Sequence, residues 1–91
     1  MFTIISYDIV NDRRRTKVMH LLKGYGTRVQ YSVFECLLNP LELAQLGAKV
    51  KLLIDQDTDS VRFYRLDEAA VKRINIYGIG QVTTEPTHWL V

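Results

Sequence analysis

Residues 2–17 of the chain read FTIISYDIVNDRRRTK, and the fold prediction starts from this stretch. Residues 2–9 have few polar interruptions, which is typical of a strand near the middle of a sheet with both faces buried. Side chains alternate along a strand, so one face receives Phe2, Ile4, Ser6 and Asp8, and the other receives Thr3, Ile5, Tyr7 and Ile9. The stretch therefore predicts a central strand that ends on a carboxylate.

A helix is predicted directly behind this strand, over about residues 13–24. Asp12 is a good N-cap for it, because a short acidic side chain accepts a hydrogen bond from a free N–H group of the first turn. Gly24 provides a stop at its C-terminal end. Apolar residues recur at helical spacing, at Val18, Leu21, Leu22 and Tyr25. We therefore expect this helix to pack on the sheet through one side.

A second strand and a second helix are predicted next. Residues rich in β-forming side chains predict one long strand at 28–38. Asn39 then suits the N-cap of a second helix, with Pro40 at its first position. Glu42 lies three residues after Asn39, as in a capping box. This helix is predicted to run to about residue 53.

Two more strands are predicted near the end of the chain, at residues 61–66 and 73–79, with a turn or short helix at residues 67–72 between them. The order of elements is closest to βαββαβ, the ferredoxin-like arrangement of an α+β protein. Either residues 28–38 or residues 61–66 must supply the hairpin strands, so the sequence leaves the strand count open.

The chain is expected to form one domain, residues 1–80, followed by a C-terminal tail, residues 81–91. A chain this short buries only about 60–65% of its extended surface, so it gains stability from a partner. The tail closes on the apolar residues Trp89, Leu90 and Val91. We expect them to pack either on their own domain or, preferably, on a second copy of the chain, which predicts a homodimer.

Charge is unevenly distributed along the chain, although the net charge is only +2. Residues 1–34 carry six cations and two carboxylates, whereas residues 35–91 carry six cations and eight carboxylates. The N-terminal part is therefore the candidate surface for a polyanion. No apolar stretch is long enough to span a membrane and no signal-peptide pattern opens the chain, which predicts a cytoplasmic protein without a membrane partner. The one cysteine, Cys36, is expected in the core or at an interface.

Asp8 has two interpretations. An aspartate at the end of a strand often caps a turn. Alternatively, Asp8 is a ligand of Mg²⁺, because this ion keeps several waters and is often held by only one or two protein carboxylates. A twofold dimer that brought two copies of Asp8 together would make such a site from one residue type.

Four cations follow Asp8 within nine residues, at Arg13, Arg14, Arg15 and Lys17. One interpretation is a solvated helix face. However, the helix dipole disfavours a cation in the first turn by about 0.3–1 kcal/mol. The alternative is that a nucleic-acid phosphate compensates these charges, since it can accept from guanidinium groups and from free backbone N–H groups.

Three further residues extend the nucleic-acid hypothesis. Arg28 is placed to bind a phosphate, and Phe34 is placed either to stack on a base or to fill the core. Tyr7 precedes Asp8 but points to the opposite face, so we expect it to pack or to support the site.

Several motifs occur together, namely Tyr7-Asp8-Ile9, Asp12, Arg15, Lys17, Tyr25-Gly26 and the run RVQYSVFE at residues 28–35. In combination they resemble the CRISPR-associated protein two family, the smaller of the two universal adaptation proteins. The likeness covers residues 1–38 by motif and the rest by length and order of elements. It implies a ferredoxin-like fold and a homodimer.

The resemblance also implies an activity and a partner. Members of the family are magnesium-dependent endonucleases that act on single-stranded RNA or double-stranded DNA, and they bridge dimers of the CRISPR integrase. Asp8 matches the metal-binding aspartate of the family. Arg15, Arg28 and Phe34 match residues implicated there in nuclease function. Lys17 stands where some members have arginine, which keeps the charge but not the bidentate fork.

Two functional hypotheses follow. In the first, paired copies of Asp8 hold Mg²⁺ in a phosphodiesterase site. In the second, the protein is an architectural scaffold that binds duplex phosphates and integrase, and Asp8 is dispensable. Both require the cations and the dimer, so the sequence leaves them open.

Overall fold

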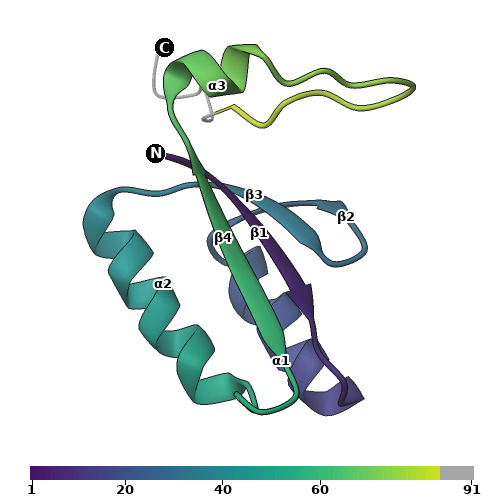
Figure 1. The fold of residues 1–91 in the computed structure, drawn as a ribbon, viewed down its shortest axis with the longest axis vertical. Coiled ribbons are helices and arrows are strands. Elements are labelled where there is room, and N and C mark those ends of the chain that lie inside the picture. Colours follow the sequence, from purple (N-terminus) through teal and green to yellow (C-terminus); the bar gives the residue numbers. More distant parts are fainter. Residues whose placement is uncertain (85–91) are drawn as a thin grey trace.

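A computed structural model of the protein describes residues 1–84. Along the chain its elements are β1 (Phe2–Asp8), α1 (Asp12–Lys23), β2 (Gly26–Gln30), β3 (Val33–Leu37), α2 (Pro40–Leu53), β4 (Ser60–Leu66) and α3 (Glu68–Lys72). The strands form one sheet in the order β2-β3-β1-β4, and each neighbouring pair is antiparallel (Figure 1). The predicted βαββαβ, ferredoxin-like α+β fold is therefore confirmed.

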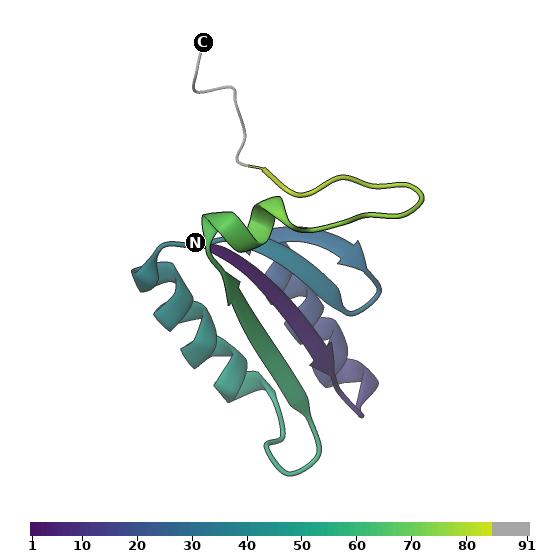
Figure 2. The same ribbon diagram turned by 45° about the horizontal axis from the view of Figure 1, so that its top comes forward.

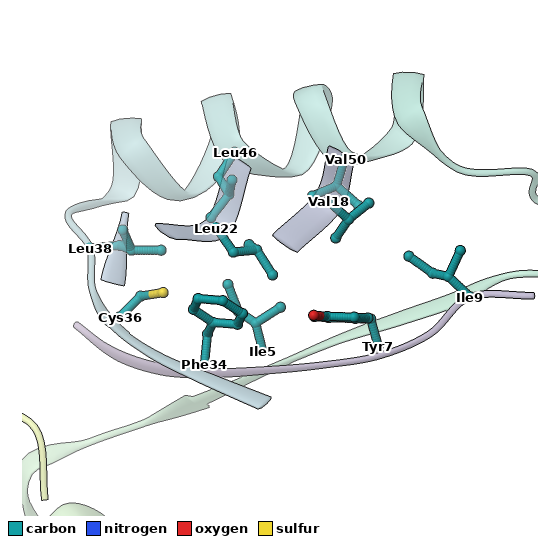
Figure 3. Close-up of a cluster of buried hydrophobic side chains, with 10 residues drawn as sticks. All are labelled: Ile5, Tyr7, Ile9, Val18, Leu22, Phe34, Cys36, Leu38, Leu46 and Val50. Atoms are coloured by element: carbon teal, nitrogen blue, oxygen red, sulfur yellow. The ribbon is translucent and has the colours of Figure 1, made fainter. Parts of the chain in front are cut away.

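The core lies between the sheet and the two long helices, α1 and α2 (Figure 3). The face of β1 predicted to carry Thr3, Ile5, Tyr7 and Ile9 points into it, and each of these residues is buried. The stripe predicted for α1 contributes Val18 and Leu22 to the core, α2 contributes Leu46 and Val50, and all four residues are buried. Cys36 is buried in this core as expected, and burial raises the pKa of its thiol to about 11.

We call the opposite side of the sheet the open face, because neither long helix covers it (Figure 3). By alternation, β1 presents Phe2, Ile4, Ser6 and Asp8 on this face. The chain returns to this side after α3, where the backbone N–H and Oγ1 of Thr83 donate to Oε1 of Glu35 at 3.1 and 2.7 Å. Figure 2 shows α3 and the segment behind it at the end of the sheet where the chain begins.

The helix starts agree only in part with prediction. At α2, Asn39 is the N-cap, Pro40 opens the helix, and the capping box with Glu42 is present, as predicted. At α1 the prediction was wrong by one residue. The N-cap is Asn11, whose Oδ1 accepts from the backbone N–H of Arg14 at 2.9 Å, and Asp12 is already the first helical residue. Asparagine and aspartate cap equally well, so the sequence pattern did not separate the two positions.

The predicted long strand at residues 28–38 is wrong, because β2 and β3 form a hairpin that turns at Tyr31 and Ser32. No glycine, proline, asparagine or aspartate marks this turn, so the run of β-forming residues looked continuous. Other contacts stabilise it. The backbone N–H of Tyr7 donates to the carbonyl of Ser32 at 3.1 Å, and the Arg28 guanidinium donates to the carbonyl of Tyr31.

The strand predicted at residues 73–79 is also absent from the structure. A strand requires a neighbour that takes up its backbone hydrogen bonds. Within residues 1–84, no strand pairs with this segment, and its side chains Tyr77 and Ile79 are 91% and 99% exposed. Composition alone therefore overestimated the strand content.

No helix in the described part of the chain is long and apolar enough to cross a membrane. The cytoplasmic location and the division at residue 80 stay predictions. The predicted packing of Trp89, Leu90 and Val91 concerns residues that lie outside the described ones.

Candidate functional site

Asp8 is the last residue of β1, and its side chain is exposed at the end of the open face. It pairs with Ser60, the first residue of β4, in the antiparallel ladder. Within residues 1–84, no hydrogen bond or ion pair engages its carboxylate. It therefore does not cap the turn behind β1, and both of its oxygens can accept from a ligand.

Two recesses adjoin Asp8. One has a volume of about 290 Å³ and lies on the open face between Ser6, Asp8, Ser60 and Arg62. The other has a volume of about 300 Å³ and is lined by Tyr7, Asp8, Ile9, Arg15, Tyr31 and Ser32. Asp8 thus lies where these two recesses meet.

Arg15 supports the chain directly behind Asp8. Its Nε and Nη2 donate to the carbonyl of Ile9 at 3.2 and 3.0 Å, and its Nη1 forms an ion pair with Oδ1 of Asp12 at 2.6 Å. The hydrogen bond with Asp12 raises the pKa of Arg15. Most donors of this side chain therefore bind the protein, and its contact with a phosphate stays a prediction.

Arg14 is neutralised within the chain. Its Nε and Nη2 donate to the carboxylate of Asp59 at 2.8 and 3.3 Å. A phosphate is therefore not needed to compensate the charge of Arg14, although the sequence had suggested one for these cations. The compensating charge for Arg14 comes from a loop 45 residues away in sequence.

Arg28 is exposed, but it too binds the backbone, donating from Nε and Nη2 to the carbonyl of Tyr31 at 3.0 and 2.7 Å. Its guanidinium also lies 5.1 Å from the centre of the Tyr31 ring. Tyr7 donates from its hydroxyl to the same carbonyl at 3.4 Å, and burial raises the pKa of Tyr7. Tyr7 and Arg28 together hold the β2–β3 turn against the end of β1.

Phe34 does not offer a surface for base stacking. It is fully buried, and its ring stacks on that of Tyr7 with the ring centres 6.4 Å apart. The prediction that Phe34 stacks on a base is contradicted, because a side chain without exposed area cannot contact a ligand in this fold. The core alternative is correct.

Arg13 and Lys17 are the two predicted cations whose side chains are exposed and form no hydrogen bond or ion pair within the described residues. They lie four positions apart in α1, so they project from one side of the helix. This side is solvent-exposed and belongs to the helical layer, whereas Asp8 lies on the open face.

A family model described as CRISPR associated protein Cas2 matches residues 1–74 of the chain. The chain belongs to this family. The CRISPR-associated endoribonuclease Cas2 3 of Chloroflexus aurantiacus is 58% identical over 91 residues, which cover 100% of this chain and 98% of the relative. The resemblance inferred from the motifs is therefore confirmed.

Solved structures agree with the fold. A Cas2 structure from Streptococcus pyogenes superposes with a TM-score of 0.76 at 35% identity, covering 86% of this chain and 100% of that chain. A chain of a partial Cas6-RT-Cas1–Cas2 complex superposes with a TM-score of 0.74 at 32% identity, covering 93% and 96%.

The donor set of this Cas2-family chain fits a hard metal ion only in part. Within residues 1–84 no group of three or more histidine, cysteine, aspartate or glutamate side chains could hold a metal. In the described residues Asp8 is an exposed oxygen donor without a partner, which suits an ion that keeps most of its waters. The part of one chain that the structure describes therefore offers one carboxylate ligand at this point, and water, nucleic acid or a second copy could supply further ligands.

Sequence reasoning missed two residues beside Asp8. Ser60 and Arg62 reach the site from β4, because Asp8 pairs with Ser60 and Ser6 pairs with Arg62. Alternation along β4 would have placed these two residues on one face. Their alignment with Asp8 depends on the register between β1 and β4, which the sequence pattern does not specify.

Proposed function

We propose that this protein is a metal-dependent endonuclease that cleaves single-stranded RNA or double-stranded DNA and acts as a homodimer in CRISPR spacer acquisition. The observation that carries the proposal is Asp8, a carboxylate at the end of a central strand with no partner in residues 1–84 and with a recess on either side. The name of the Chloroflexus aurantiacus relative, an endoribonuclease, supports the same class of reaction.

Asp8 would hold the metal, and Mg²⁺ is the ion whose preference for few carboxylates and several waters suits it best. When bound, such an ion supplies charge stabilisation for the transferring phosphoryl group and lowers the pKa of a bound water. A homodimer that brought two copies of Asp8 together would double the carboxylate ligands at the site.

The other residues of the proposed site bind the phosphates of the substrate or hold the backbone beside Asp8. Arg62 lies on the open face in the same recess as Asp8. Within residues 1–84 its guanidinium forms one hydrogen bond, to the neutral Tyr64 Oη at 3.3 Å, so its remaining donors can bind a substrate phosphate. Arg15, through the Ile9 carbonyl, holds the backbone beside Asp8. Arg13 and Lys17 would bind phosphates farther along the nucleic acid.

A second candidate function is a non-catalytic scaffold that binds DNA and CRISPR integrase. The favouring observation is that Arg13 and Lys17 project from α1 in the helical layer, whereas Asp8 is on the open face. A polyanion can therefore bind these cations without reaching Asp8. The chain matched in the Cas1–Cas2 complex is consistent with such an assembly.

Metal dependence tests the proposed activity directly. We expect the full chain to cleave labelled single-stranded RNA or double-stranded DNA in Mg²⁺, and to lose this activity in EDTA with recovery when Mg²⁺ is restored in excess. Gel analysis of the products over time measures it. An intact substrate in both Mg²⁺ and Mn²⁺, together with normal spacer integration in the presence of integrase, would contradict the nuclease proposal and support the scaffold.

Salt dependence tests the role of Arg13 and Lys17. Each phosphate contact contributes about 0.9 to the slope of log affinity against log salt for duplex DNA, because it releases a counterion. We therefore expect the double variant Arg13→Ala, Lys17→Ala to bind duplex DNA more weakly, with a slope smaller by about 2 per chain. Fluorescence anisotropy over a salt series measures both quantities.

The matched control for this prediction is Lys51→Ala, Arg65→Ala, which also removes one lysine and one arginine from exposed positions. Both control residues line the groove between α2 and β4, away from α1. The control variant should keep the wild-type slope. Equal slopes for the wild-type protein and both double variants would show that Arg13 and Lys17 contact no phosphate.

A further inference from the structure

Asp59 is a buried carboxylate in the loop between α2 and β4. Its side chain is completely inaccessible, whereas the Arg14 side chain that pairs with it is 30% exposed. Figure 1 shows this loop and the turn between β1 and α1 at the same end of the sheet. An ionised group is rarely buried in so small a domain without a full set of partners.

The partners of Asp59 are all hydrogen-bond donors. Oδ2 accepts from Nε of Arg14 at 2.8 Å and from the backbone N–H of Asp55 at 2.9 Å. Oδ1 accepts from the backbone N–H of Val10 at 3.1 Å, from Nη2 of Arg14 at 3.3 Å and from the hydroxyl of Thr58 at 3.3 Å. Only an ionised carboxylate, which accepts and does not donate, satisfies such a set.

The Arg14 guanidinium and the backbone N–H groups of Asp55 and Val10 hold the pKa of Asp59 well below its usual range. The carboxylate is therefore charged throughout the working pH range of a nuclease. The Asp59 carboxylate also explains how α1 tolerates a cation in its first turn, because it compensates the charge of Arg14.

Asp59 is linked to Asp8 in two ways, through its hydrogen bond with Val10 and through its chain neighbour Ser60. Val10 lies two residues after Asp8, so Asp59 fixes the chain where it leaves β1. Ser60 follows Asp59 directly and pairs with Asp8 in the β1–β4 ladder. Asp59 therefore restrains both the backbone behind Asp8 and the strand beside it.

We propose that Asp59 is a positioning residue of the nuclease site: with Arg14 it holds the backbone of Val10 and Ser60 in the geometry that presents Asp8 to metal and substrate. This inference rests on the proposed nuclease function of Asp8. It assigns no contact with substrate to Asp59, which is buried. It also reassigns Arg14 from phosphate binding to the support of Asp8.

A positioning role makes a different prediction from a purely structural one. A displacement of about 1 Å at a reacting group costs on the order of 100-fold in rate. Loss of the Asp59 contacts should therefore lower kcat far more than it weakens nucleic-acid binding, which Arg13 and Lys17 support. A structural role would lower the melting temperature and leave kcat per folded molecule unchanged.

The test uses Asp59→Asn. The amide N–H₂ group of asparagine is a donor, so it cannot accept the hydrogen bonds that one carboxylate oxygen of Asp59 accepts. Its matched control is Asp67→Asn, an equal substitution at the N-cap of α3, where asparagine caps as well as aspartate. We expect Asp59→Asn to reduce kcat at least about 10-fold, with the dissociation constant for nucleic acid changed less than about 3-fold. Asp67→Asn should match the wild-type protein in both. Assays run well below the melting temperature of every variant.

A second readout does not depend on cleavage. Mn²⁺ binding is followed by paramagnetic broadening of the backbone N–H signals of Ile9 and Ser60, which flank Asp8 in the chain and in the ladder. Asp59→Asn should need more Mn²⁺ than Asp67→Asn for the same broadening. Arg14→Lys keeps the positive charge but loses the two-pronged guanidinium contact with Asp59. The Mn²⁺ concentration that it needs for the same broadening should lie between those of Asp59→Asn and the wild-type protein.

The outcomes separate the two proposals. If the wild-type protein cleaves and Asp59→Asn cleaves at the same rate with unchanged Mn²⁺ binding, Asp59 does not position Asp8, whereas the nuclease function stands. A loss of kcat that only follows the unfolded fraction would likewise overturn the positioning role. If the wild-type protein neither cleaves nor binds Mn²⁺ beside Asp8, the proposed nuclease function itself fails.

Discussion

Asp8→Asn is expected to abolish most of the cleavage activity, lowering kcat at least about 100-fold, because loss of a partner outside the first ligand shell already costs about 10–100-fold. The amide keeps the size of the side chain but removes the charge that would hold the metal. Asp8 is exposed and has no internal partner in residues 1–84, so the fold should not depend on its charge. Cleavage of labelled RNA and DNA in Mg²⁺, measured beside the melting temperature, tests this expectation.

The control for this variant is Asp57→Asn, which removes the same charge from an exposed position in the α2–β4 loop. It should cleave like the wild-type protein. Unchanged cleavage by a folded Asp8→Asn protein would remove Asp8 from the catalytic site.

Spacer integration with the CRISPR integrase should be measured on the same two variants. If Asp8→Asn loses cleavage but supports integration, the nuclease is real and adaptation does not require it. If both activities are lost at an unchanged melting temperature and an unchanged affinity for integrase, adaptation depends on cleavage.

Phe34→Ala is expected to destabilise the fold by about 3–5 kcal/mol, the usual cost of removing a large aromatic ring from a core. Phe34 is fully buried and stacks on Tyr7, so its removal leaves a cavity next to the end of β1. A domain of this size has a total stability of only about 5–15 kcal/mol. Urea denaturation should therefore show a partly unfolded protein at low denaturant or a strongly lowered midpoint.

Tyr31→Ala is the control for Phe34→Ala, since Tyr31 is an aromatic residue of the same hairpin but is 65% exposed. Its removal should cost much less stability. A Phe34→Ala protein as stable as the wild type, with weaker binding to single-stranded nucleic acid, would restore the base-stacking role that the structure contradicts.

The sequence predicted the regular parts of the fold well because they follow local rules. Alternation placed Thr3, Ile5 and Tyr7 in the core, and the Asn39–Glu42 capping box marked the start of α2. The turn at Tyr31 and Ser32 escaped prediction because it contains no glycine, proline, asparagine or aspartate, and hydrogen bonds from Tyr7 and Arg28 stabilise it instead. The β-propensity of individual residues does not contain information on such contacts.

Of the candidate site, the sequence indicated Asp8 but not the residues that surround it. Asp8 stood out at the end of a strand, but Arg62 joins it only through the register of β1 against β4. Asp59 reaches Arg14 across 45 residues of sequence, a pairing that no local pattern indicates. The arginines at the start of α1 suggested either a solvated helix face or a bound phosphate, and neither alternative included an anion from the chain itself.

The two hydrogen bonds from Arg15 to the Ile9 carbonyl affect how alanine scanning of this surface should be interpreted. An Arg15→Ala variant removes a charge and, in the same step, releases the peptide unit next to Asp8. A fall in its activity therefore measures a displaced carboxylate as well as a lost cation. The side chain of Arg13 is charged and binds no backbone group within residues 1–84, so Arg13→Ala measures the electrostatic contribution without displacing the backbone.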